Sequence, residues 1–167
     1  MATVLYPLDI RGAGVGTSAI PELVFISGTN APVWGYAFDG ATREDIYYSI
    51  PLLLYGSGNI TVNAKVYSRA GTTSGTIVFG ARIACITAGD AVSMEAKNWA
   101  TAQQSSSTTI NSTAKGATPV SITVSNLDSA TANDEMWLNF YRLPADAGDT
   151  ITTDMIVTNL YLSYSDT

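Results

Sequence analysis

The feature that most limits the fold of this chain is a repeated two-residue alternation of apolar and polar side chains. The alternation runs through several short segments, and stretches rich in Gly, Ser, Thr and Asn separate them. The clearest segment places four apolar residues on one face: Ile60, Val62, Ala64 and Val66. Successive side chains of a strand point to opposite faces, so this period predicts strands. Helical spacing is nearly missing, and only residues 90–102 are expected to hold one short helical turn.

Segments of this kind recur along the whole chain. Strands are expected at residues 23–26, 33–38, 45–54, 60–67, 76–87, 119–126, 135–143 and 155–164, with a further edge strand within 106–113. The last strand is expected to align Ile156, Leu160, Leu162 and Tyr164 on its inner face. Strands 60–67 and 76–87 are expected to pair antiparallel through a turn at 70–75.

The segment pattern contains no strand–helix–strand unit, so the sheets should be antiparallel. About eight strands of this length predict an all-β, antiparallel two-sheet jelly-roll-like β-sandwich, with a closed barrel as the alternative. Residues 1–20 carry a glycine-dense stretch around Gly14 and are expected to form a flexible N-terminal arm. Residues 21–167 are expected to form a single β-sandwich domain.

The side chains that most enzymes need are missing from this sequence. The 167 residues include no histidine and one cysteine, Cys85, and only 13% are charged. A histidine-dependent nucleophile and the usual zinc ligand sets are therefore excluded. The carboxylate pairs at 44–45 and 134–135 are adjacent in sequence, so they point to opposite faces of a strand and neither is a ready glycosidase pair. Two carboxylates that converge across strands are the alternative that the sequence leaves open. We expect neither catalysis nor a cofactor.

Charge and hydrophobicity narrow the choice of partners. The net charge of −6 disfavours contact with a phosphate backbone, so nucleic acid is not an expected partner. No apolar segment approaches the length of about 20 residues that a membrane helix needs. The N-terminus carries neither a basic nor a long apolar signal region, which predicts synthesis and folding in a cytoplasm.

Two groups of residues are candidate binding sites. Asp146, Asp149 and Asp154 lie near a Gly-containing turn and are weak candidates for calcium, which prefers oxygen ligands. Turn chemistry alone also explains aspartates at such a place. The second group consists of aromatic residues suited to the core, a subunit interface or stacking on sugar rings. Its members are Trp34, Tyr36, Tyr67, Trp99 and Trp137.

Three segments resemble bacteriophage virion proteins. They are residues 38–63, which include the sequence IPLLLYGSGNITV, residues 71–79 (GTTSGTIVF) and residues 141–150 (YRLPADAGDT). Together they cover about half of the chain, and they are similar in style to head decoration (cement) proteins and to jelly-roll domains of tail or neck proteins. The resemblance implies a homotrimer on a virion and no catalytic residues.

The sequence therefore leads to two functional expectations. The first is a non-enzymatic capsid decoration protein, made in the host cytoplasm, that binds the major capsid protein or another virion protein and stabilises the head by mass action. The alternative is a carbohydrate-binding or receptor-binding module of a tail fibre, which would contact glycans through Trp34, Trp99 or Trp137.

Overall fold

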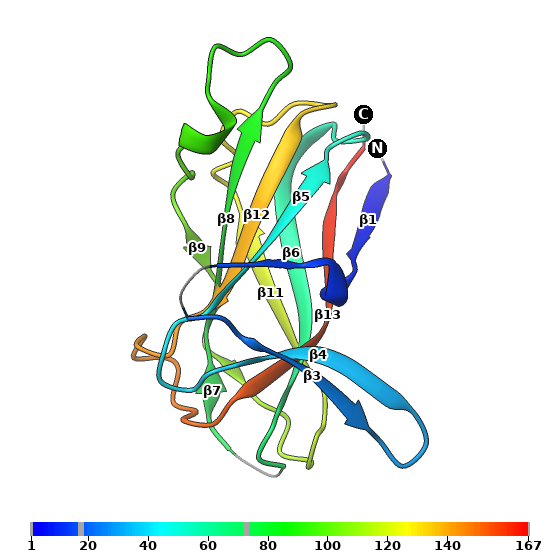
Figure 1. Ribbon diagram of the computed structural model, residues 1–167, viewed down its shortest axis with the longest axis vertical. Coiled ribbons are helices and arrows are strands. Elements are labelled where there is room, and N and C mark those ends of the chain that lie inside the picture. The colour runs from blue at the N-terminus through cyan, green and yellow to red at the C-terminus, as the bar shows by residue number, and fades with distance from the viewer. Residues whose placement is uncertain (1, 17–18, 72–73, 167) are drawn as a thin grey trace.

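A computed structural model describes residues 2–16, 19–71 and 74–166, and over these residues the chain folds into two antiparallel sheets (Figure 1). Sheet A contains, in order, β11 (Thr118–Val124), β6 (Ser57–Ser68), β13 (Met155–Ser165), β4 (Pro32–Phe38) and β3 (Glu22–Ser27), with β1 (Thr3–Leu8) also paired to β13. Sheet B contains, in order, β2 (Gly14–Val15), β5 (Asp45–Pro51), β12 (Glu135–Arg142), β8 (Phe79–Ile86) and β9 (Gln103–Gln104). Two short strands, β7 (Thr76–Ile77) and β10 (Thr108–Thr109), form a separate ribbon. The predicted β-sandwich is confirmed.

The core lies between the two sheets, where the alternating apolar faces meet. The four alternating apolar residues predicted in β6 are buried, and the alternating apolar residues of β8, β11 and β12 are buried in the same way. Three phenylalanines form its centre: the Phe79 and Phe140 rings stack with centroids 5.1 Å apart, and the Phe38 ring meets both of them edge-on. Such arrangements add attraction beyond the area they bury.

Strand β13 departs from the predicted alternation at one point. Its register against β6 shifts between Val157 and Asn159, which marks a β-bulge. An extra residue inverts the alternation, so Val157 faces the core while Ile156 faces the other side. Ile156 packs there in a small separate cluster that includes Val24 and Tyr67. The prediction was wrong for Ile156 and right for the three apolar positions after the bulge.

The predicted pairing of strands 60–67 and 76–87 is wrong. β6 pairs with β11 and β13 in sheet A, whereas β8 pairs with β12 and β9 in sheet B. The connection between them therefore crosses from one sheet to the other. Residues 72–73 of the predicted turn lie outside the described residues. A segment rich in glycine and threonine fits a crossing as well as a hairpin, because both need the same loop chemistry.

The expectation of a flexible N-terminal arm is also wrong for the described part of residues 1–20. All six residues of β1 pair with the end of β13, and Leu8 is buried in the core. The short 3₁₀ helix η1 (Ile10–Gly12) then carries the chain across to sheet B, where Gly14 and Val15 pair with β5. The many glycines of this segment indicated conformational freedom of the backbone. They could not show that β4 pairs only with the first part of β13, which leaves the rest of that strand edge for β1.

Two further segments stand out from the sandwich. The β3–β4 hairpin projects from one end of the molecule (Figure 1). The predicted helical turn within 90–102 appears as the 3₁₀ helix η2 (Met94–Ala96), in the long connection from β8 to β9. Within the described ranges, no helix has the length and apolar character needed to cross a membrane.

Candidate functional site

The outer face of sheet B carries the most distinctive group of side chains on the molecule. Strand β12 lies in the middle of this sheet, so each of its outward residues has a neighbour on β5 and on β8. Trp137 stands between Ser49 and Ala84, and Asn139 stands between Tyr47 and Arg82. The same alternation that buries Met136, Leu138 and Phe140 points these residues outward. Five outward strand residues and one residue of the β8–β9 connection, Trp99, form what we call the sheet B platform: Tyr47, Arg82, Trp99, Trp137, Asn139 and Tyr141.

A chain of hydrogen bonds fixes the polar part of the platform. Asn139 is fully buried; its Oδ1 accepts a hydrogen bond from Arg82 Nε at 2.8 Å, and its Nδ2 donates to Asp45 Oδ1 at 2.9 Å. Asp45 in turn forms an ion pair with Arg43 at 2.7 Å. The Arg43 guanidinium lies 3.6 Å from the centroid of the Tyr141 ring, within cation–π distance. Three strands are thus connected by side chains whose polar groups hold one another in place.

Tyr141 is buried beneath this guanidinium. Burial raises the pKa of the Tyr141 phenol, while the positive charge of Arg43 acts in the opposite direction. Its ring covers Gly80 on β8, where a Cβ atom would collide with it. Glycine at this position therefore allows the ring to lie flat against the sheet.

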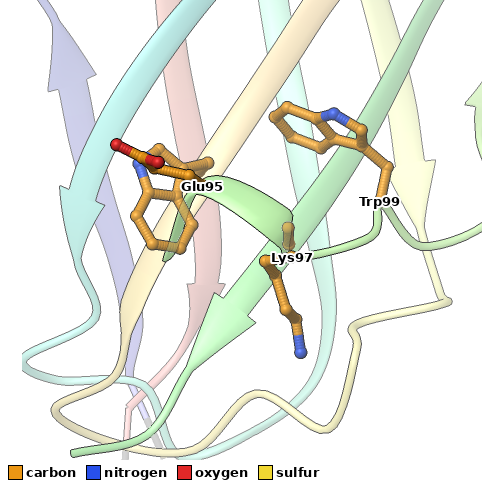
Figure 2. Close-up of a pocket in the computed structure, with 5 residues that line it drawn as sticks. Glu95, Lys97 and Trp99 are labelled. Carbon is orange, nitrogen blue, oxygen red and sulfur yellow. The ribbon is translucent and has the colours of Figure 1, made fainter. Parts of the chain in front are cut away.

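Trp99 reaches the platform from the long connection between β8 and β9. Two contacts hold this segment against the sheet: Lys97 forms an ion pair with Asp128 at 2.9 Å, and the Ala100 amide donates to the Ile83 carbonyl at 2.9 Å. The Trp99 ring then lies 5.0 Å from the Arg82 guanidinium and 6.0 Å from the Tyr47 ring centroid. A loop residue is thereby held over the strands, beside a hollow that Figure 2 shows in close-up.

The hollow has a volume of about 190 Å³ and is lined by Ala84, Glu95, Lys97, Trp99 and Trp137. Trp99 and Glu95 stand on opposite sides of it in Figure 2. The small side chain of Ala84, between the two tryptophans, leaves this space open. Pockets that enclose a drug-sized molecule are larger, about 300–1,000 Å³. An open hollow with aromatic walls and charged rims suits one ring of a longer ligand.

A second hollow continues the first along the same strands. It has a volume of about 460 Å³, and its lining includes Ile86, Asp90 and Glu135. Glu135 pairs with Ile86 one row beyond the row that contains Trp137 and Ala84, on the same outward face. The rows from Glu135 to Asn139 extend over about 13 Å at the usual rise of a strand. The two hollows lie at successive rows of the same outward face, and we call them together the groove.

The structure brings two of the five aromatic candidates together, namely Trp99 and Trp137. Tyr36 is buried in the main core, and Tyr67 is buried in the small cluster on the outer face of sheet A. Trp34 is 42% exposed on the projecting hairpin, where its ring centroid lies 4.8 Å from that of Phe25. It lies in sheet A and does not line the groove.

The three aspartates considered for calcium point to separate partners. Asp149 is fully buried in an ion pair with Arg142 at 2.8 Å, and Asp154 pairs with Arg69 at 3.1 Å. Asp146 accepts hydrogen bonds from the Gly148 amide and the Gln104 side chain. The structure does not gather them around a common point. Among the described residues, no cluster of three or more acidic, histidine or cysteine side chains could hold a metal ion.

Sequence reasoning missed several residues of the platform. Arg82 and Asn139 lie in the predicted strands 76–87 and 135–143, but neither was recognised as part of a site. One signal was available: Asn139 is a polar residue in a strand otherwise rich in large apolar side chains, and such residues require hydrogen-bond partners. The partners themselves come from strands far away in sequence.

Comparison with known proteins gives a match in fold and none in sequence. No protein-family profile matches this chain, and no curated protein is significantly similar to it in sequence. The CBM22-1 and GH10 modules of Clostridium thermocellum endo-1,4-β-D-xylanase 10B, complexed with xylohexaose, match with a TM-score of 0.54 and 14% identity, over 97% of this chain and 28% of that one. The family 11 carbohydrate-binding module from C. thermocellum, in complex with a β-1,3-1,4-mixed-linked tetrasaccharide, matches with a TM-score of 0.51 and 15% identity, over 97% and 96% of the two chains.

These matches show that the chain shares the jelly-roll β-sandwich fold of carbohydrate-binding modules. Nothing in the comparisons points to bacteriophage virion proteins specifically. The resemblance to virion proteins is therefore supported only at the level of the fold. The expected homotrimer, the capsid partner and the location on a virion stay predictions.

Proposed function

We propose that this protein is a non-catalytic carbohydrate-binding module that holds a polysaccharide or oligosaccharide in the groove on the outer face of sheet B. One observation carries the proposal: Trp99 and Trp137, which are far apart in sequence, line one open hollow floored by Ala84. Aromatic rings offer flat apolar surfaces against which sugar rings stack, and polar groups beside them bind hydroxyls. Glu95 on the rim of the hollow and Arg82 beside Trp99 supply such groups.

The shared fold adds support to this proposal. Both matched structures described above were determined with bound oligosaccharides, and both have TM-scores above 0.5. The absence of histidine is compatible with binding, because stacking and hydrogen bonding need no group that titrates near neutral pH. A binding module also explains why so few charges are needed on a surface that contacts neutral hydroxyl groups.

Titration calorimetry against a panel of soluble oligosaccharides, from xylan, mixed-linked β-glucan and acidic polysaccharides, tests the proposal. Trp137→Ala should weaken binding by about 30-fold or more, as expected for loss of a central tryptophan contact, and Trp99→Ala should weaken it in the same direction. Trp34→Ala is the matched control, because its ring is exposed but lies in sheet A. The proposal fails if no glycan binds, or if Trp34→Ala weakens binding as much as Trp137→Ala does.

A further inference from the structure

Arg82 is held in a fixed orientation beside Trp99, which lines the hollow. Its Nε donates to Asn139 Oδ1 at 2.8 Å, and Asn139 is fully buried with its amide donating to Asp45. The Trp99 ring centroid lies 5.0 Å from the guanidinium carbon of Arg82, so the guanidinium also packs over an aromatic ring. A guanidinium restrained by both a hydrogen bond and an aromatic ring loses little further freedom when a ligand binds.

The donors of Arg82 are only partly used within the protein. The carboxylate of Asp45, which binds the Asn139 amide, is already paired with Arg43. Among the residues that the structure describes, the two terminal nitrogens of Arg82 form no hydrogen bond; its one side-chain hydrogen bond comes from Nε. Four N–H groups in the plane of the guanidinium thus remain for a ligand, and this planar fork matches the two oxygens of a carboxylate.

The opposite end of the groove has the opposite charge. Glu95 lines the first hollow together with Lys97, whose charge is paired with Asp128, and Glu135 and Asp90 line the second. Carboxylates on a ligand would be repelled there, since nearby like charges are unfavourable. The groove therefore has a cationic end at Arg82 and Trp99 and an acidic end at Glu135.

From this asymmetry we propose that the groove prefers an acidic oligosaccharide that bears a single uronic acid, with the uronate carboxylate on Arg82 and neutral sugar rings extending over Trp137. The inference rests on the proposed carbohydrate-binding function and names its ligand class. A polymer in which every sugar is a uronate fits less well, because its other carboxylates would lie beside Glu95 and Glu135.

The test compares two probes that differ by one carboxylate: a neutral xylo-oligosaccharide and the same oligosaccharide carrying one glucuronic acid. Titration calorimetry of the wild type should show the acidic probe binding about tenfold to a hundredfold more tightly, as expected for a charge-assisted hydrogen bond. The advantage should shrink as NaCl is raised, because salt screens the ion pair. Arg82→Gln should abolish the difference between the probes, and Arg82→Lys should retain part of it. Lys65→Gln is the control, because this exposed residue lies on the outer face of sheet A.

The outcomes separate the two proposals. Equal binding of both probes by the wild type overturns the uronate inference and leaves carbohydrate binding intact, whereas binding of neither probe nor any other glycan overturns both. A preference that persists in Arg82→Gln also overturns the inference, because the carboxylate would then bind elsewhere. If Arg82→Gln proves to be unfolded by its urea transition, the salt dependence of the wild type and the Arg82→Lys variant decide the question.

Discussion

Replacing Arg142 by methionine should destabilise this protein more than loss of a surface ion pair. Arg142 and Asp149 are both fully buried, and they form a two-pronged pair in which Nε and Nη2 donate to the two carboxylate oxygens at 3.0 and 2.8 Å. The guanidinium also donates to four backbone carbonyls: those of Phe38, Asp39, Ile151 and Thr153. It thereby connects the end of β4 with the loop that leads into β13.

The size of the effect follows from what the substitution leaves behind. Removing one partner of a buried ion pair costs about 3–5 kcal/mol, because the remaining charge is uncompensated. Backbone carbonyls left without a donor add about 1–3 kcal/mol each unless water reaches them. Arg142→Met should therefore lower the free energy of unfolding by at least about 3 kcal/mol, out of the roughly 5–15 kcal/mol typical of a domain.

Urea unfolding followed by tryptophan fluorescence measures this loss. Arg69→Met is the matched control: Arg69 is partly exposed and paired with Glu22 and Asp154, so its loss should cost no more than about 1 kcal/mol. The double variant Arg142→Met with Asp149→Leu should recover part of the stability, because it removes the unpaired charge. The reasoning is refuted if Arg142→Met costs no more than Arg69→Met, or if the double variant recovers nothing.

Two more predictions concern Cys85 and Gly80. Burial raises the pKa of the Cys85 thiol from 9.0 to about 12. A thiolate-specific reagent at pH 8 should therefore react with Cys85 only as urea unfolds the protein. Rapid reaction of the folded protein would contradict this prediction. The folded state holds the thiol proton more tightly than the unfolded state does, so the neutral thiol stabilises the fold below pH 9 and this stabilisation declines as the pH rises toward 12. The free energy of unfolding of Cys85→Ala should therefore fall less than that of the wild type over this pH range. Gly80→Ala places a Cβ against the Tyr141 ring and should cost about 1–3 kcal/mol in urea unfolding. Gly12→Ala is the control, because the nearest atom to its new Cβ would be 3.7 Å away. If Gly12→Ala lowers the free energy of unfolding as much as Gly80→Ala does, crowding of the Tyr141 ring is not the cause.

The sequence by itself determined the strands and their inner faces. Alternation identified Ile60, Val62, Ala64 and Val66 as residues of one buried face, and each is 0–3% exposed. It succeeded because a period of two is a local property of the backbone that needs no knowledge of the partner strand. It failed at Ile156, where a single bulge inverts the faces of β13. Composition also excluded the histidine-dependent chemistries, and that exclusion holds in any fold.

Only the tertiary structure decided which strands are neighbours, and the site depends on that choice. Residues 60–67 and 76–87 follow each other in sequence yet lie in different sheets, whereas β12 is inserted between β5 and β8. This insertion places Asn139 between Tyr47 and Arg82 and sets Trp137 beside the loop that carries Trp99. The tertiary structure also decided that the side chains of Arg142 and Asp149 are buried as an ion pair. The alternation of residue types predicts which face of its own strand a side chain occupies. The order of the strands depends on how all of them are buried together, so it cannot be predicted from the spacing of residues within one strand.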